Sequence, residues 1–266
     1  RGLHDYGMLS TAKHFPGHGD TETDSHSALA QIPSDSSRLW TIELPPFKSA
    51  IDAGVDAVMV AHVNAPDFQD HAQDPATLSK FWMQDILRDQ LGFKGVIITD
   101  AMRMGGIIKN YSDEYALVAT IRAGSDIIIQ NMNLKKSIDT VERAVIDGVI
   151  LEEQINKSAL KVLKMKERLG LHQDRLIKTD YTYRAIGKAE NFKMAEEIAM
   201  RAITLVKNEE NVLPLSPGID DTLYVVDLYD GPNNHSESSL TRQLKDVGSN
   251  RRVISFQIDK SDSTVV

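Results

Sequence analysis

The chain has 266 residues, no cysteine and a formal net charge of −8 at pH 7. The lack of cysteine excludes disulfides, thiolate metal sites and cysteine nucleophiles, and the acidic balance argues against nucleic-acid binding and a polybasic membrane anchor. Hydrophobic residues make up 41% of the chain and charged residues 26%, which is typical of a globular protein, and no apolar run approaches the roughly 18 to 20 residues of a transmembrane segment.

The first half of the chain alternates between strand-like and helix-like patterns. Short apolar runs, typical of strands buried on both faces, occupy residues 8–15, 55–62, 95–100 and 125–130. Patterns that predict helices occupy residues 44–53, 79–91, 113–123, 135–147 and 151–169. The alternation predicts βαβ units in a parallel sheet.

Polar residues stand at the ends of successive predicted strands, as His14, His62 and Asp100. A (β/α)8 barrel collects its active site from several strand ends in this way. The sequence has no glycine-rich phosphate-binding loop after a strand, which argues against a doubly wound nucleotide-binding sheet. The predicted fold class is α/β, with residues 1–171 forming the C-terminal half of a (β/α)8 TIM-type barrel, its last four βα units. The chain opens at Arg1 without an initiator methionine, so we expect a fragment or processed product whose first four units lie upstream.

The remainder of the chain has a different organisation. Residues 172–190 are polar and show no apolar period, which predicts a linker. Beyond it, helical patterns occupy residues 191–201 and 238–247, and strand-like runs occupy residues 203–207, 222–228 and 252–258. Residues 191–266 are therefore expected to open a second α/β domain that is truncated before its sheet closes.

Chemistry-bearing side chains are densest directly after the first predicted strand, where residues 13–21 read KHFPGHGDT and residues 24–26 read DSH. Asp24 and His26 form a candidate dyad, in which the carboxylate fixes the imidazole tautomer and the ring gives or takes a proton near neutral pH. The alternative is that Asp24 caps a turn and His26 is a surface imidazole.

Two further groups belong to the same segment. Lys13 and His14 lie at the end of the predicted strand, and a lysine buried there needs a polar partner. That partner is either a carboxylate or a ligand hydroxyl at the barrel mouth, or it is the acidic residue of a structural ion pair. His18 lies between Gly17 and Gly19, a pattern that favours a histidine fixing a tight turn.

Asp100 ends its strand at the predicted rim of the sheet, where a nucleophile or general base would lie; the alternative is a helix N-cap. Donor atoms for a metal are present in His14, His18, His26 and Asp24, but no HExxH-type spacing occurs. No GxSxG motif, which carries the nucleophile of many Ser-His-Asp triads, occurs in the sequence, and this argues against such a triad. We therefore predict neither a metal nor a cofactor.

These motifs resemble glycoside hydrolase family 3, most closely its β-N-acetylglucosaminidase (NagZ-like) branch. The matching segments are KHFPGHGDT (residues 13–21), DSH (24–26), VMVAH (58–62) and GFKGVIITD (92–100), the last followed by Met102 and Met104. The likeness covers about residues 9–171. More loosely, TLVKN (204–208) and VLPL (212–215) resemble the start of the α/β sandwich domain that follows the barrel in many members.

The resemblance implies a role for each candidate residue. Asp100 would be the catalytic nucleophile, and His26 the acid/base that Asp24 orients. Lys13, His14, His62 and Met104 would contribute to substrate binding, with Lys13 and His14 hydrogen-bonding the sugar hydroxyls. Gly17, His18 and Gly19 would shape the loop.

The function that follows is a retaining exo-β-N-acetylglucosaminidase, which removes terminal N-acetylhexosamine from cell-wall (muropeptide) or chitin-type glycans through a covalent glycosyl-enzyme. A bacterial role in peptidoglycan recycling is expected. The alternatives are a β-N-acetylglucosaminide phosphorylase, a β-glucosidase-type member of the family, and a non-catalytic sugar-binding or degenerate fragment. The expected partner is a carbohydrate with terminal β-linked N-acetylglucosamine, with no nucleic acid and no transmembrane segment. Localisation stays open between cytoplasm, periplasm and secretion.

Overall fold

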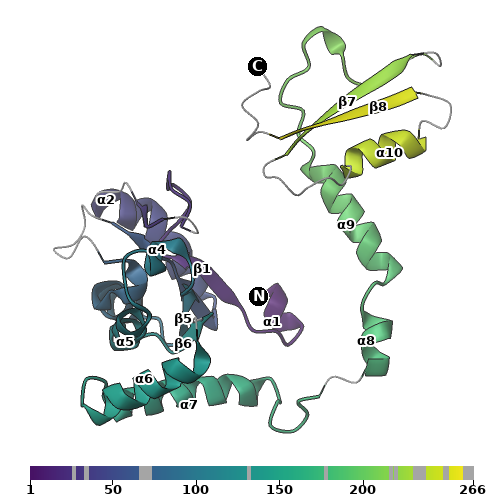
Figure 1. Ribbon diagram of the computed structural model, residues 1–266. Coiled ribbons are helices and arrows are strands. Elements are labelled where there is room, and N and C mark those ends of the chain that lie inside the picture. The colour runs from purple at the N-terminus through teal and green to yellow at the C-terminus, as the bar shows by residue number, and fades with distance from the viewer. Residues whose placement is uncertain are drawn as a thin grey trace. The chain divides into compact units, whose positions relative to one another are not determined.

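The computed structural model describes residues 1–25, 28–32, 36–65, 74–130, 133–176, 179–215, 218, 221–229, 238–247 and 252–259. The chain separates into two compact units, Arg1–Lys178 and Thr179–Val266, and both contain strands and helices (Figure 1). The division falls within the polar segment for which a linker is predicted. No described helix combines the length and the apolar character needed to cross a membrane.

A four-stranded parallel sheet forms the centre of the first unit. Its strands are β1 (Thr11–Phe15), β3 (Ala57–Val60), β5 (Val96–Ala101) and β6 (Ile127–Ile129). Their order in the sheet is their order in the chain, as in successive βα units of a barrel. The predicted α/β class and all four strands are confirmed. Burial on both faces holds for the inner strands β3 and β5, whereas β1 and β6 are only partly covered because they lie at the edges.

The five predicted helices of this unit are also present, as α3 (Leu44–Asp52), η3 (Phe81–Gln90), α5 (Asp113–Ala123), α6 (Leu134–Ile146) and α7 (Glu152–Arg168). Local capping explains their bounds. At the start of α5 the Ser112 hydroxyl accepts a hydrogen bond from the Tyr115 N–H, and the helix ends at Gly124 with φ +121°, a backbone region that favours glycine.

The core of the unit lies between the sheet and these helices. Phe15, the last residue of β1, packs edge-on against Phe47 of α3 and Trp82 of η3, with ring centroids 5.2 and 6.1 Å apart. Phe15 and Trp82 are fully buried. The end of β1 is therefore held by aromatic packing just before the loop that carries the predicted site.

Several short elements were not predicted from the sequence. They are α1 (Gly2–Asp5), β2 (Ala30–Gln31), α2 (Ser36–Arg38), η1 (Leu39–Glu43), β4 (Val63–Asn64), η2 (Ala76–Leu78) and α4 (Gly105–Ile108). Segments of two to five residues are too short to show an apolar period. The pairing of β2 with β4 joins the segment after the predicted site loop to the continuation of β3.

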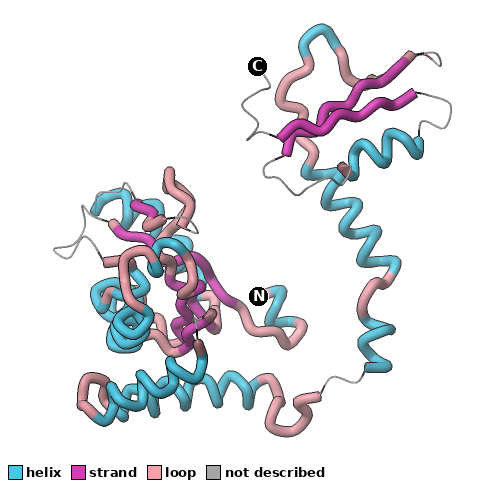
Figure 2. The backbone as a smooth tube through the Cα atoms, viewed as in Figure 1, coloured by secondary structure: helices cyan, strands magenta, loops and turns pink. Residues whose placement is uncertain are grey.

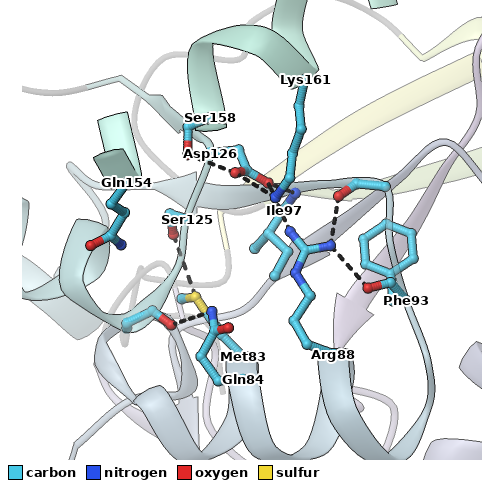
Figure 3. Close-up of polar contacts among 12 residues, drawn as sticks. Met83, Gln84, Arg88, Phe93, Ile97, Ser125, Asp126, Gln154, Ser158 and Lys161 are labelled. Atoms are coloured by element: carbon cyan, nitrogen blue, oxygen red, sulfur yellow. Dashed lines mark hydrogen bonds and ion pairs between the residues drawn. The ribbon is translucent and has the colours of Figure 1, made fainter. Parts of the chain in front are cut away.

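A buried polar cluster fastens α7 to the amino-terminal side of the sheet, opposite the strand ends that carry the predicted site (Figure 3). The Asp126 carboxylate accepts hydrogen bonds from Arg88 of η3 at 2.8 Å, from Ser158 and Lys161 of α7 at 2.7 and 2.9 Å, and from the Ile97 N–H at 2.9 Å. The Asp126 side chain is only 2% exposed. One carboxylate thus joins two helices to two neighbouring strands.

Asp56 plays a similar part at the start of β3. Its carboxylate lies 2.6 Å from His4 Nε2, accepts a hydrogen bond from the Ser10 N–H at 2.7 Å, and pairs with Arg168 of α7. Burial alone would raise the pKa of Asp56, but the hydrogen bonds from Ser10 and His4 and the charge of Arg168 hold it below its ordinary value.

The second unit contains α8 (Thr179–Ala185), α9 (Ala189–Ala202), η4 (Glu209–Asn211), β7 (Thr222–Tyr229), α10 (Ser239–Val247) and β8 (Arg252–Asp259). Strands β7 and β8 pair in parallel from Thr222↔Arg252 to Tyr229↔Asp259 (Figure 2). Helix α8 lies inside the segment for which a linker is predicted.

The strand predicted at residues 203–207 is wrong, because these residues form no regular structure. Their apolar alternation satisfies a local pattern, but a strand also needs a neighbour to accept its backbone hydrogen bonds, and no described strand pairs with them.

Candidate active site

Two of the predicted site residues meet at the carboxyl-terminal rim of the sheet. His14 comes from β1 and Asp100 from β5, and His14 Nε2 lies 3.7 Å from Asp100 Oδ2. Parallel strands place their carboxyl ends at one edge, which is why residues so far apart in the sequence come together. The His14 side chain is 30% exposed and that of Asp100 15%, so both remain accessible to a ligand.

Asp100 does not cap a helix, and the N-cap interpretation is therefore wrong. Helix α4 begins at Gly105 with Met104 as its N-cap residue. The Asp100 Oδ1 atom instead accepts a hydrogen bond from the Ala101 N–H at 2.7 Å, and Oδ2 faces His14. The carboxylate is thus held from one side and open on the other, as a nucleophile requires.

Lys13 is exposed, contrary to the expectation of a buried lysine, because β1 is an edge strand of the described sheet. It forms no hydrogen bond or ion pair with any described residue, so the structural ion pair is not found there. A hollow of about 450 Å³ lies beside it, lined by Lys13, His14, Gly17, His18 and Gly19 together with residues of η1 and α3. The peptide bond between Lys13 and His14 is cis.

His18 organises the loop that follows. Its Nδ1 atom lies 2.8 Å from the Thr21 hydroxyl, and its Nε2 atom lies 2.7 Å from the Ser25 hydroxyl. Gly17 has φ +147°, and a Cβ atom there would come within 2.6 Å of the Glu43 carboxylate. This is the geometry that a loop-fixing role for His18 and its neighbouring glycine requires.

The predicted dyad is only partly described. Asp24 is exposed, and its carbonyl accepts a hydrogen bond from the Ala28 N–H, whereas His26 and Ser27 lie outside the described residues. The Ser25 carbonyl accepts a hydrogen bond from the Gly106 N–H of α4 at 3.3 Å. The residue preceding His26 is thus attached to the helix that follows Asp100, while the dyad itself stays a prediction.

His62 is fully buried beneath this junction. Its Nδ1 atom lies 2.7 Å from the Thr77 hydroxyl and its Nε2 atom 2.9 Å from the Ala101 carbonyl oxygen. Burial lowers the pKa of His62 below its ordinary value, against the opposing influence of the Ala101 carbonyl and the Asp100 charge. Both ring nitrogens thus lie within hydrogen-bond distance of protein groups, and the contribution of His62 to substrate binding stays a prediction.

Met104 is 7% exposed and donates its backbone N–H to the Ala101 carbonyl at 3.0 Å. It lies in the turn after Asp100, and a contact of its side chain with substrate stays a prediction. Sequence reasoning missed Ser25, Thr77 and Gly106, all of which shape this junction. Nothing in their local sequence distinguishes them, because each partner is distant along the chain.

Two features of the described residues bear on other kinds of site. No group of three or more histidine, aspartate or glutamate side chains among them is placed to hold a metal ion. A second hollow, of about 440 Å³, lies on the amino-terminal side of the strands against α7 and includes none of the predicted site residues. In barrels that side serves stability, and the carboxyl-terminal side carries catalysis.

The amino-acid sequence of the chain is similar to those of known proteins. Residues 1–165 match the glycosyl hydrolase family 3 N-terminal domain. The chain is also 31% identical, over 234 residues, to a beta-N-acetylglucosaminidase/beta-glucosidase from Cellulomonas fimi. That match covers 85% of this chain and 41% of the relative, so the chain spans less than half of that protein's length.

Solved structures agree with the sequence comparison. A glycoside hydrolase family 3 beta-N-acetylglucosaminidase from a Paenibacillus species superimposes with a TM-score of 0.80 at 32% identity, covering 97% of this chain and 50% of that one. A beta-glucoside phosphorylase superimposes with a TM-score of 0.86 at 26% identity, covering 97% of this chain and 48% of that one. The parallel sheet, the strand-end residues and these matches together show that the chain belongs to glycosyl hydrolase family 3.

Proposed function

We propose that the protein is a retaining exo-β-N-acetylglucosaminidase that removes terminal β-linked N-acetylglucosamine from a glycan. The observation that carries the proposal is the pairing of Asp100 with His14 at 3.7 Å, at a rim where the loop leading to Asp24 and His26 is attached to α4. Relatives named for beta-N-acetylglucosaminidase activity support the choice of sugar.

In the first step Asp100 acts as the nucleophile. Its ionised carboxylate attacks the anomeric carbon, the glycosidic C–O bond breaks, and protonated His26 gives its proton to the departing oxygen. Sugar and Asp100 are then joined as a glycosyl ester. Lys13 and His14 bind sugar hydroxyls, a role to which the exposed ammonium and the half-exposed imidazole are suited.

In the second step water replaces Asp100. Neutral His26 takes a proton from water, the water oxygen attacks the anomeric carbon, and the ester bond to Asp100 breaks, which restores both groups. A histidine serves both steps near neutral pH because its reference pKa is about 6.5. Asp24 orients the ring, as in other carboxylate–imidazole pairs.

The finer assignments belong to the same proposal. The natural substrates are cell-wall (muropeptide) or chitin-type fragments, and the setting is bacterial peptidoglycan recycling. The named relative is bacterial, from Cellulomonas fimi, and its activity on a terminal amino sugar is compatible with either source.

A phosphorylase is the second candidate, favoured by the structural match to a beta-glucoside phosphorylase. A neutral histidine in place of a catalytic carboxylate would not repel an anionic acceptor, and the exposed Lys13 ammonium would attract one. In that case phosphate oxygen, in place of water, would attack the glycosyl ester and release a sugar 1-phosphate.

One experiment separates the candidates. The full-length protein is incubated with an aryl N-acetyl-β-glucosaminide with and without inorganic phosphate, and the products are identified by NMR. We expect free N-acetylglucosamine, released first as the β-anomer, with phosphate having little influence on the rate. Sugar 1-phosphate as the main product would replace the hydrolase assignment by the phosphorylase, and no turnover in either buffer would contradict both.

A further inference from the structure

We propose that His62 is a positioning residue for the nucleophile, acting on Asp100 through the backbone carbonyl of Ala101. The inference rests on the proposed function, in which Asp100 attacks the sugar. It is an alternative to the substrate-binding role that the resemblance implies for His62.

The contact runs through the residue that follows the nucleophile. His62 Nε2 lies 2.9 Å from the Ala101 carbonyl oxygen, and since a carbonyl only accepts hydrogen bonds, Nε2 carries the proton. The same oxygen accepts the Met104 N–H at 3.0 Å, so both of its lone pairs are used. On the other side of Ala101, its N–H donates to Asp100 Oδ1 at 2.7 Å.

The imidazole is itself held in one orientation. The proton on Nε2 is directed at Ala101, and the other ring nitrogen, Nδ1, lies 2.7 Å from the Thr77 hydroxyl. Thr77 is fully buried, and its oxygen also lies 2.7 Å from the Ala61 carbonyl. The Thr77 hydroxyl donates to Ala61 and lies beside His62, so the two residues that follow β3 hold it in place.

The backbone beside His62 is closely packed at Gly106. A Cβ atom on Gly106 would come within 3.3 Å of the His62 Cβ atom, 3.3 Å of the Ala28 carbonyl and 3.4 Å of the Ser25 carbonyl. His62, which follows β3, and the backbone at Ser25 and Ala28 thus converge at Gly106 in the turn after β5. A buried donor held at both ring nitrogens fixes its acceptor in turn, and nucleophilic attack is sensitive to such placement.

The test uses two uncharged replacements in the full-length protein. The amide nitrogen of glutamine reaches the place of histidine Nε2, so His62→Gln keeps a donor for Ala101 but loses the Thr77 contact. The amide group of asparagine reaches only the place of Nδ1, so His62→Asn keeps a partner for Thr77 but leaves the Ala101 carbonyl without its donor. Both variants remove the ring, and only the second removes the contact that the inference names.

Rates are measured with an aryl N-acetyl-β-glucosaminide whose good leaving group needs no protonation, so that formation of the glycosyl-enzyme at Asp100 is observed directly. We expect His62→Asn to lower the rate constant of that step about 10²-fold, the cost typical of a misplacement of about 1 Å, with KM within twofold. His62→Gln should stay within about fivefold of the parent protein, which would be rescue by the conservative variant.

Other results would overturn the inference. Equal losses in both variants would show that the ring matters but the Ala101 contact does not, unchanged rates in both would show that neither matters, and a raised KM in both with kcat retained would restore direct sugar binding. If His62→Asn does not fold, Thr77→Val is compared with Thr77→Ser: only the valine variant should slow glycosyl-enzyme formation, and equal rates in the two would count against the inference.

Crystal structures of the Gln and Asn variants separate this inference from the proposed function. If the parent protein shows no turnover, the function fails, but the position of Asp100 is still measurable. The His14–Asp100 distance should be kept in the Gln variant and changed in the Asn variant; the same distance in both would reject the positioning role.

Discussion

Single residues at the rim of the sheet decide the chemistry proposed for this protein. The carboxylate of Asp100 is held by the Ala101 N–H and faces His14, while the Lys13 ammonium has no partner among the described residues. The proposed nucleophile, an imidazole and an exposed ammonium group along one rim suit the neutral, hydroxyl-rich ligand of the proposed function. Two predictions concern individual side chains there.

Asp100→Asn should abolish turnover while the protein still folds. The amide has nearly the shape of the carboxylate but is a poor nucleophile, and at 15% exposure the neutral amide costs less to bury than the carboxylate that it replaces. We expect kcat on an aryl N-acetyl-β-glucosaminide to fall by about 10³-fold or more, with an unchanged thermal unfolding midpoint. Activity within a few-fold of the parent protein would exclude Asp100 as the nucleophile.

His26→Ala tests the predicted acid/base, which lies outside the described residues. Substrates with poor leaving groups should lose about 10² to 10⁴-fold in rate, because these need protonation. Activated substrates should instead form the glycosyl-enzyme and stall, since no base activates the water. Asp24→Asn should act in the same sense but less severely, because the imidazole remains. A change below threefold on a poor-leaving-group substrate would show that another residue supplies the proton.

At the scale of elements, the site depends on helices fastened to the opposite side of the sheet. Asp126 joins η3 and α7 to β5 and β6 through four donors. Asp56 joins α7 to the start of β3. Both carboxylates are nearly inaccessible, at 2% and 5% exposure. Removing the charge of Asp126 also leaves Arg88, which is only 13% exposed, without its carboxylate partner.

Asp126→Asn should therefore lower the free energy of unfolding by about 3 to 5 kcal/mol, the usual cost of breaking a buried pair from one side. A matched control is Asp139→Asn, because Asp139 pairs with Lys135 at 3.1 Å on the exposed face of α6. That variant should change stability by less than about 0.5 kcal/mol. Urea unfolding of both variants checks the contrast, and equal effects would mean that the Asp126 cluster contributes no more than a surface pair.

For the molecule as a whole, the ionisation of Asp56 makes the stability of the first unit depend on pH in the acid range. Its pKa is lowered in the folded state, so its contribution is complete above the unfolded-state value of about 3.9 and is lost as the pH falls through the lower folded value. Asp56→Asn should cost about 1 to 3 kcal/mol at neutral pH and flatten the decline of stability below about pH 4. An acid limb as steep as that of the parent protein would assign that decline to other carboxylates.

Most of the regular structure was predictable because its signals are local. The apolar runs that become β1, β3, β5 and β6, and the capped patterns that become α5 and α6, each lie within one short window of sequence. The strand at residues 203–207 failed for the complementary reason, since pairing depends on a distant partner that a local pattern does not contain. The meeting of His14 and Asp100 was predictable only through the fold class, which places parallel strand ends at one rim.

The sequence by itself determined the family motifs, the parallel α/β architecture and the strand ends at which Lys13, His14 and Asp100 stand. Only the tertiary structure decided that Asp100 caps no helix, that Lys13 has no ion-pair partner among the described residues, and that His62 is enclosed between Thr77 and Ala101. The physical reason is range: periodicity and capping act over a few residues, whereas burial and hydrogen-bond partners depend on segments that folding brings together from far along the chain.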